Sequence, residues 1–282
     1  MPDQLSLLRV LTMNIWTFSA PYAERMRLLR AGIEALAPDL LAFQEAGYAD
    51  GRHQVAECLE GMGYHLLHQF ELTPFPGRDN ACCVAARWPL ELVELLPQAV
   101  SERSRSYPYA ALAVRVAAPE PVGPLLFVCA KPSWELCAEY ERELQAVALA
   151  RLVARHADPA GFPPIIAGDF DATPDSAGIR FLTGKQSLDG MSVCFRDAWA
   201  EAGDGGEGYT WTSDNPYVAE MIERRLFQTR HARRIDYIFL GSFHDYAPFA
   251  RITRCRVALN EPSDGVWPSD HYAVCAEIAT AR

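Results

Sequence analysis

Two carboxylates follow a short apolar run in the middle of the chain. Residues Ile165 to Ala167 lie between Pro163-Pro164 and Gly168, which is typical of a short core strand. Asp169 and Asp171 are two residues apart, so in extended backbone their side chains would point the same way. Converging carboxylates repel each other unless positive charge lies between them, and a hard divalent cation often supplies it. We therefore expect a metal site here, although acids in this position can also cap a following helix.

Five other polar residues lie at or near the ends of predicted core strands. They are Asn14, Glu45, Asp236, Asp270 and His271. Although scattered in sequence, they can meet at one edge of packed sheets. Glu45, Asp169 and Asp270 offer the oxygen ligands that Mg²⁺ or Mn²⁺ prefers. His271 with Asp236 gives a base whose imidazolium can be stabilised. A metal ion beside a carboxylate-supported histidine is suited to hydrolysis at phosphorus.

Strands and helices alternate along the chain and must position these residues. The expected strands are 7–16, 39–45, 64–70, 81–87, 110–116, 125–130, 165–171, 235–240, 251–259 and 272–278. The expected helices are 22–36, 55–62, 140–152 and 174–182, while residues 215–234 fit neither pattern. No Pro- or Ser-rich linker divides the chain, so we expect one domain over residues 1–282. The pattern predicts an α/β (α+β) protein in which two sheets pack together under helices.

Length and composition restrict the class of protein. The chain has 282 residues, of which 22% are charged and half are hydrophobic, as in ordinary globular proteins. Its formal net charge of −10 argues against binding long duplex nucleic acid, which needs a basic surface. The eight cysteines form no Cys-x-x-Cys pair, and neither a secretory signal nor a membrane-spanning apolar run is evident. We expect a cytoplasmic protein with reduced thiols and no transmembrane segment. The oligomeric state leaves no signal in the sequence.

Five short motifs follow one another over nearly the whole chain. They are Thr12-Met13-Asn14, Phe43-Gln44-Glu45, Gly168-Asp169-Phe170-Asp171, Arg234-Ile235-Asp236-Tyr237 and Ser269-Asp270-His271. Their order resembles the signature of the endonuclease/exonuclease/phosphatase (DNase I-like) superfamily. The resemblance implies a four-layer α/β/β/α sandwich that cleaves a phosphoester with metal-activated water. It also implies that Glu45 and Asp270 bind the metal with Asn14 beside them. Asp169 would orient or deprotonate the water, and His271 with Asp236 would contact the phosphate or act as acid and base.

Two positions depart from the superfamily pattern. Its Gly-Asp-x-Asn motif has Asp171 in place of Asn, and a carboxylate repels a phosphate to which an amide would donate. We expect Asp171 to be an extra metal ligand or protonated. After the 125–130 strand the superfamily places a phosphate-contacting histidine or tyrosine, which we assign to Ala130. Three explanations stay open: Lys131 replaces the lost group, the protein is a weakened or non-hydrolytic relative, or the sequence carries an inactivating substitution.

Three further residues are candidates for binding the substrate. Asn80 lies where the superfamily often has a substrate-side asparagine, and Trp134 and Trp211 could line a cleft. A structural role is the commoner one for tryptophan. An arginine-rich stretch could hold a second anionic group or be a solvated loop. Its members are Arg224, Arg225, Arg230, Arg233 and Arg234.

The sequence thus predicts a phosphoesterase that needs Mg²⁺ or Mn²⁺. Its expected substrate is a small or lipid-derived phosphodiester or phosphomonoester. One alternative is a nuclease that acts on DNA or RNA. The other is a catalytically weakened or silent relative that still binds anions, which the alanine at position 130 favours.

Overall fold

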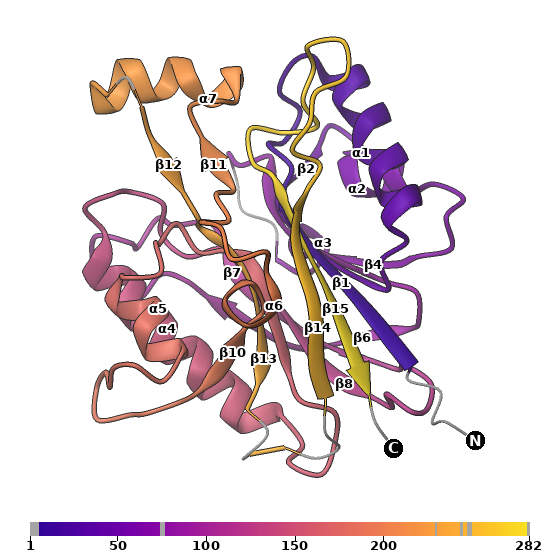
Figure 1. The fold of residues 1–282 in the computed structure, drawn as a ribbon, viewed down its shortest axis with the longest axis vertical. Helices are drawn as coiled ribbons and strands as arrows, with labels where there is room; N and C mark the ends of the chain where they lie inside the picture. The colour runs from indigo at the N-terminus through magenta and orange to yellow at the C-terminus, as the bar shows by residue number, and fades with distance from the viewer. Residues whose placement is uncertain (1–5, 74–76, 229, 243–244, 247–249, 281–282) are drawn as a thin grey trace.

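Two large β-sheets form the centre of the protein, and helices cover their outer faces (Figure 1). The computed structural model describes residues 6–73, 77–228, 230–242, 245–246 and 250–280. The first sheet has the strand order β14-β15-β1-β2-β5-β4, with β3 paired to β2. Its strands are β1 (Ser6–Asn14), β2 (Leu40–Ala49), β3 (Arg52–His53), β4 (His65–His68), β5 (Asn80–Ala86), β14 (Ala250–Ala258) and β15 (Ala273–Thr280).

The second sheet has the strand order β10-β13-β9-β8-β7-β6. Its strands are β6 (Leu90–Pro97), β7 (Ala110–Val116), β8 (Leu125–Ala130), β9 (Ile165–Asp169), β10 (Phe195–Asp197) and β13 (Asp236–Gly241). A separate two-stranded ribbon pairs β11 (Trp211–Thr212) with β12 (Ala232–Arg233). The helices are α1 (Tyr22–Leu36), α2 (Gln54–Leu59), α3 (Gln69–Leu72), α4 (Glu139–His156), α5 (Ala177–Leu182), α6 (Ala198–Ala202), α7 (Pro216–Met221) and the π-helix η1 (Ile222–Leu226).

Alternation along the strands sorts apolar side chains into three layers. In β1, Leu8 and Val10 point into the core between the sheets, whereas Leu11 and Met13 belong to the layer under α1. In β9, Ile165 and Ala167 lie between the sheets, and Ile166 joins the layer under α4 and α5. The resulting α/β/β/α sandwich is the predicted fold class.

Several stretches differ from the predicted elements, including the following two. The structure ends the expected 64–70 strand at His68, which is buried and accepts a 3.1 Å hydrogen bond from the Phe70 backbone at the start of α3. The 90–97 segment forms an edge strand that we did not expect, because glutamates interrupt its apolar pattern. Edge strands carry such charges since one side faces solvent.

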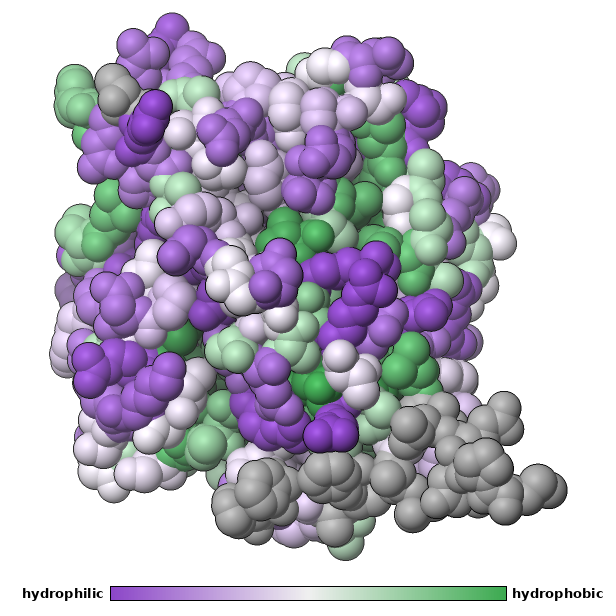
Figure 2. All heavy atoms as spheres, viewed as in Figure 1, coloured by the Kyte–Doolittle hydropathy of each residue, from purple (hydrophilic) through white to green (hydrophobic). Residues whose placement is uncertain are grey.

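The described part of the surface is mostly hydrophilic on the face shown in Figure 2, where apolar residues form small groups between polar ones. In the described part of the chain, we find no helix with the length and apolar character needed to cross a membrane.

The close contact between β8 and β9 yields a first prediction. A Cβ atom at Gly168 would lie 2.1 Å from the backbone oxygen of Ala130, which pairs with it on the neighbouring strand. We expect Gly168→Ala to lower the free energy of unfolding in urea by about 1–3 kcal/mol, because the two strands must separate.

Gly178→Ala is the matched control. Gly178 lies in helix α5, and a Cβ atom there would be 3.5 Å from its nearest neighbour, the Ala146 Cβ of α4. Because alanine favours a helix over glycine by about 0.5–1 kcal/mol, this change should be neutral or stabilising. If the two substitutions changed the free energy of unfolding equally, the close contact between β8 and β9 would not be the cause of the loss.

Candidate active site

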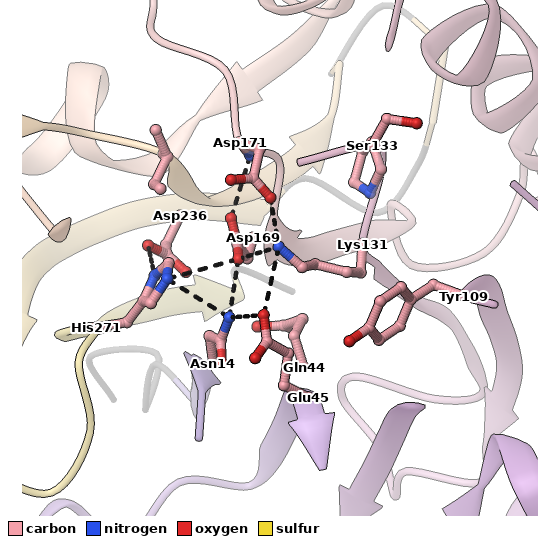
Figure 3. Close-up of polar contacts among 12 residues, drawn as sticks. Asn14, Gln44, Glu45, Tyr109, Lys131, Ser133, Asp169, Asp171, Asp236 and His271 are labelled. Carbon is pink, nitrogen blue, oxygen red and sulfur yellow. Dashed lines mark hydrogen bonds and ion pairs between the residues drawn. The ribbon is translucent and has the colours of Figure 1, made fainter. Parts of the chain in front are cut away.

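Four polar side chains continue the rows of residues that fill the core between the sheets. Asn14 ends β1, Asp169 ends β9 and Asp236 begins β13. Lys131 follows the last residue of β8. Each alternates in phase with residues of the inter-sheet core, so all four side chains enter the gap between the sheets at one end. Figure 3 shows Asn14, Lys131 and His271 converging on Asp169.

The side chain after β8 that enters the site is Lys131, and our assignment of that position to Ala130 is wrong. Leu125, Phe127 and Cys129 face the inter-sheet core, and Lys131 continues this row. Ala130 has the opposite phase and packs in the apolar layer under α4. An alanine at position 130 therefore removes no donor from the site.

Lys131 lies between the carboxylates of Asp169 and Asp171. Its ammonium nitrogen donates to Asp169 Oδ2 at 2.6 Å and also to Asp171 Oδ2. Glu45 Oε1 lies 3.8 Å away. The positive charge that we expected between Asp169 and Asp171 is thus supplied by a nearly fully buried lysine. Our prediction of a metal ion between these two acids is replaced by this ion pair.

Local backbone irregularities bring two of the acids into place. Glu45 would point to the helix side if β2 alternated regularly, but the pairing with β5 shifts between Phe43 and Ala46, and Glu45 has a φ of 51°. Asp171 lies beyond the end of β9 and has a φ of 50°, so it is not in the extended backbone that we expected. Its backbone N–H donates to Asp169 Oδ1 at 3.1 Å.

Asn14 and His271 complete the contacts of Asp169. Asn14 Nδ2 donates to Asp169 Oδ2 at 3.0 Å and to Glu45 Oε1 at 2.9 Å. His271 Nε2 is 3.8 Å from the same Asp169 oxygen, while its Nδ1 is 3.0 Å from Asp236 Oδ2. The second oxygen of Asp236 is buried and has no hydrogen-bond partner in the described structure. Asp236 therefore orients His271, as the motif predicted.

These contacts divide the titratable groups by pKa. Burial by itself would raise the pKa of Asp169, but Lys131 and His271 outweigh it and lower that pKa to about 2. Burial and the charge of Asp169 raise the pKa of Asp171 to about 6, against the opposing effect of Lys131. Burial would lower the pKa of His271, yet Asp236 and Asp169 raise it to about 10. At neutral pH the site therefore holds an aspartate beside an imidazolium and an ammonium.

Glu45 and Asp270 are two acids that could hold a divalent ion. Both line the same cavity, and each has one carboxylate oxygen without a hydrogen-bond partner among the described residues. Burial raises the pKa of Asp270 to about 6, with His271 opposing and the negative charge of Glu45 adding to the increase. A cation between these acids would relieve that repulsion. Asn14 presents its amide nitrogen to Glu45, so in this arrangement it positions a ligand.

A second group of ligand atoms lies beside this pair. Oxygen or nitrogen atoms of Asp169, Asp236 and His271 lie within 4.8 Å of one another, all buried. Asp169 Oδ2, Asp236 Oδ2 and His271 Nδ1 already pair with each other, with Lys131 or with Asn14, whereas Asp236 Oδ1 has no hydrogen-bond partner in the described structure. Most of these atoms are therefore less free to bind an ion than the second carboxylate oxygens of Glu45 and Asp270.

A cavity of about 520 Å³ opens next to these residues. Trp134 and Trp211 both line it, as predicted, with Trp134 half exposed and Trp211 buried. Asn80 is not among the described lining residues; it accepts a hydrogen bond from the hydroxyl of Tyr109, which does line the cavity. Asn80 thus supports the wall from behind.

The arginine-rich stretch is divided among different environments. Arg233 lines the cavity and donates to the Asp171 backbone oxygen at 2.7 Å. Arg234 is buried and pairs with Asp197 at 2.8 Å. Arg224 pairs with Glu220 on the surface, and Arg230 is exposed. The side chain of Arg225 lies outside the described part of the structure.

Arg25 is a positioning residue that sequence reasoning missed. It is fully buried, and its guanidinium donates to the backbone oxygens of Ser19 and Ile15 and, at 3.1 Å, of Pro268. These bonds join the loop after β1 to the loop that carries Asp270 and His271. The signal was present: Arg25 lies on the apolar face of α1, where a charged residue needs buried partners.

Comparisons with known proteins agree with this architecture. The model of the Endonuclease/Exonuclease/phosphatase family matches residues 11–271. An endonuclease/exonuclease/phosphatase from Bacteroides vulgatus superposes with a TM-score of 0.70 at 16% identity, covering 98% of this chain and 100% of that chain. D. rerio TDP2 complexed with a single-strand DNA product superposes with a TM-score of 0.68 at 19% identity, covering 97% of this chain and 99% of that chain. The human Nocturnin catalytic domain with bound sulfate superposes with a TM-score of 0.64 at 20% identity, covering 99% of this chain and 97% of that chain. No curated protein sequence matches the chain significantly.

The Lys131–Asp171 contact can be tested with a double-mutant cycle. Lys131→Met leaves Asp169 and Asp171 facing each other in a buried site, and we expect it to lower the free energy of unfolding by about 3–5 kcal/mol. Adding Asp171→Asn to Lys131→Met should restore part of this loss, because one of the repelling charges is removed. Urea unfolding at pH 7.5 measures all four proteins.

Lys185→Met serves as the control for that cycle, because Lys185 is the only other lysine and is exposed. Its replacement should change stability by less than about 0.5 kcal/mol. Strictly additive effects of Lys131→Met and Asp171→Asn would contradict a direct interaction.

The pKa of His271 predicts how stability depends on pH in chelator-treated protein. Because the folded-state pKa of about 10 exceeds the usual 6.5, the protonated histidine stabilises the protein below pH 6.5, and this stabilisation is lost as pH rises through 10. Asp236→Asn should lower this pKa and reduce the loss between pH 6.5 and 10 by about 1 kcal/mol or more. NMR titration of the imidazole and urea unfolding check both, and a wild-type pKa near 6.5 would refute the assignment.

Proposed function

The chain belongs to the endonuclease/exonuclease/phosphatase family, and on that premise we propose that it hydrolyses a phosphodiester or phosphomonoester of a small or lipid-derived substrate with Mg²⁺ or Mn²⁺. The observation that carries the proposal is the convergence of Lys131, Asn14 and His271 on Asp169, which is buried directly behind the cavity that Lys131 and His271 line. Glu45 and Asp270 line the same cavity and would hold the ion.

Asp169 is suited to orienting the attacking water. Its low pKa keeps it ionised at neutral pH, and three donors fix its carboxylate in one orientation. An ionised, fixed carboxylate accepts a hydrogen bond from water and aligns its oxygen with phosphorus. The bound divalent ion would add Lewis-acid polarisation of the phosphoryl oxygen.

His271 and Lys131 are suited to neutralising the charge that develops on the phosphoryl oxygens. Both line the cavity, and the acids beside them raise the pKa of His271 to about 10 and that of Lys131 well above its usual value, in each case against the effect of burial. Fixed cations of this kind stabilise a phosphoryl transition state. His271, protonated and held by Asp236, can also deliver a proton to the leaving oxygen.

The proposal predicts chelator-sensitive turnover of bis(p-nitrophenyl) phosphate or p-nitrophenyl phosphate. Activity should require Mg²⁺ or Mn²⁺, and Glu45→Gln should raise the metal concentration needed for half-maximal rate about tenfold or more, because one carboxylate ligand is lost. Asp169→Asn should lower kcat by about a hundredfold or more without a comparable change in metal requirement. Lys185→Met changes an exposed residue that is not among the described residues lining the cavity, and it should match the wild type.

The alternatives give different results in the same experiment. Lys131→His with Asp171→Asn installs the residue types of the superfamily pattern at both departures. A large gain in rate would show that the natural site is a weakened one, whereas a loss would show that Lys131 already serves the reaction. Absence of turnover on either ester with retained anion binding would indicate a silent relative. Metal-dependent nicking of a plasmid would favour a nuclease, against the net charge of −10.

A further inference from the structure

Two of the walls of the cavity come from segments that lie outside the two sheets. One wall belongs to the arm, which we define as residues 211–228 and 230–233 with β11, α7, η1 and β12. The arm projects from the top of the molecule in Figure 1. The other wall belongs to the strap, residues 101–109, which precedes β7.

The arm presents its own small apolar cluster to the cavity. Trp211 and the nearby Ile235 pack with Met221 and Leu226, separately from the three apolar layers of the sandwich. All four of these residues line the cavity. Trp211 and Ile235 are buried, whereas Met221 and Leu226 are only partly buried and leave apolar surface at the cavity that a ligand can cover.

Contacts with the catalytic residues fix this apolar wall close to the chemistry. Arg233 of β12 donates to the Asp171 backbone oxygen at 2.7 Å. The Trp211 ring lies 6.5 Å from the His271 ring, centroid to centroid. Tyr217 of α7 stacks on Trp16, which also lines the cavity, with 4.9 Å between the ring centroids. A group attached directly to a phosphate at His271 would therefore reach Trp211.

The strap presents aromatic rings whose hydroxyls are already used. The Tyr107 hydroxyl donates to the Pro132 backbone oxygen, and the Tyr109 hydroxyl donates to Asn80. The two rings lie 5.3 Å apart, and both line the cavity together with Pro108. Because their hydroxyls have partners, the rings offer the ligand mainly carbon surface.

The end of the cavity next to Arg103 offers little support for a second anionic group on the substrate. Arg103 lines the cavity, but its guanidinium donates to the Cys137 backbone oxygen at 2.9 Å and to Cys137 Sγ at 2.7 Å. Glu135 and Glu141 line the cavity beside it and offset its charge. This end is therefore not a strongly positive pocket for a second phosphate.

We propose that the space between the arm and the strap binds an apolar, ring-sized group attached to the phosphate. The inference rests on the proposed function and adds the chemical class of the substrate: a phosphoester with a hydrophobic or aromatic substituent, as opposed to a polyphosphorylated one. The volume of about 520 Å³ accommodates a phosphate and such a group.

Binding of two non-hydrolysable probes tests this inference apart from catalysis. Phenylphosphonate and methylphosphonate share the phosphonate and differ in the apolar group, and isothermal titration calorimetry with Mg²⁺ gives their affinities. We expect phenylphosphonate to bind about tenfold more tightly or better, because the ring buries apolar surface. Equal affinities, or no binding of phenylphosphonate, would overturn the inference.

Variants of the arm locate the site. Met221→Ala with Leu226→Ala should weaken phenylphosphonate binding about fivefold or more and leave methylphosphonate within twofold. Phe227→Ala is the matched control, since Phe227 is the next residue, is 89% exposed and is not among the described lining residues. If the double variant does not fold, Leu226→Gln can be measured in its place, because it replaces an apolar side chain with a polar one of similar size and should also weaken phenylphosphonate binding. A loss in Phe227→Ala equal to that in the double variant would contradict the proposed location.

The inference and the proposed function can fail separately. Chelator-sensitive turnover of bis(p-nitrophenyl) phosphate without a preference for phenylphosphonate would overturn the inference alone. A clear preference for phenylphosphonate without turnover of either nitrophenyl ester would support the pocket and count against hydrolysis.

Discussion

The ammonium group of Lys131 is the interaction on which the rest of the site depends. It contacts Asp169 and Asp171, two carboxylates that could not stay ionised side by side in a buried position without it. With Asn14 also donating to Asp169, the acid is fixed in one orientation. A fixed carboxylate between cations differs physically from a flexible surface acid, because the surrounding dipoles and charges need little rearrangement when a charged substrate reacts.

The core between the sheets determines where this cation can lie. Side chains in phase with the inter-sheet apolar rows meet at the end of the gap, where the apolar residues give way to polar ones. Asn14 comes from one sheet, and Lys131, Asp169 and Asp236 come from the other. Packing of the two sheets therefore sets the distances within the site, and the same apolar surface that drives folding holds the charged groups together.

Regular alternation made part of the site predictable from sequence, and irregular backbone hid the rest. Asn14, Asp169 and Asp236 follow from strand ends and phase. The same rule, applied along β8, would have selected Lys131 in place of the alanine before it. The side chain of Glu45 reaches the site because β2 has a bulge, and that of Asp171 does so because its backbone is left-handed. Neither conformation has a sequence signal as strong as periodicity. The four layers were predictable because the strands and helices in them have regular apolar periods. The described part of residues 215–234 forms α7, η1 and β12 around an apolar cluster that is too small to produce such a period.

The two departures from the superfamily pattern form one structural unit. Taken alone, an aspartate in place of an asparagine adds negative charge to a phosphate site, and a lysine in place of a neutral side chain adds positive charge. In the structure the two groups contact each other, so the pair changes the net charge little. Each acidic or basic substitution is costly in a buried site unless the other accompanies it. Because residues 131 and 171 are forty positions apart, only the pairing of β8 with β9 reveals that they compensate each other.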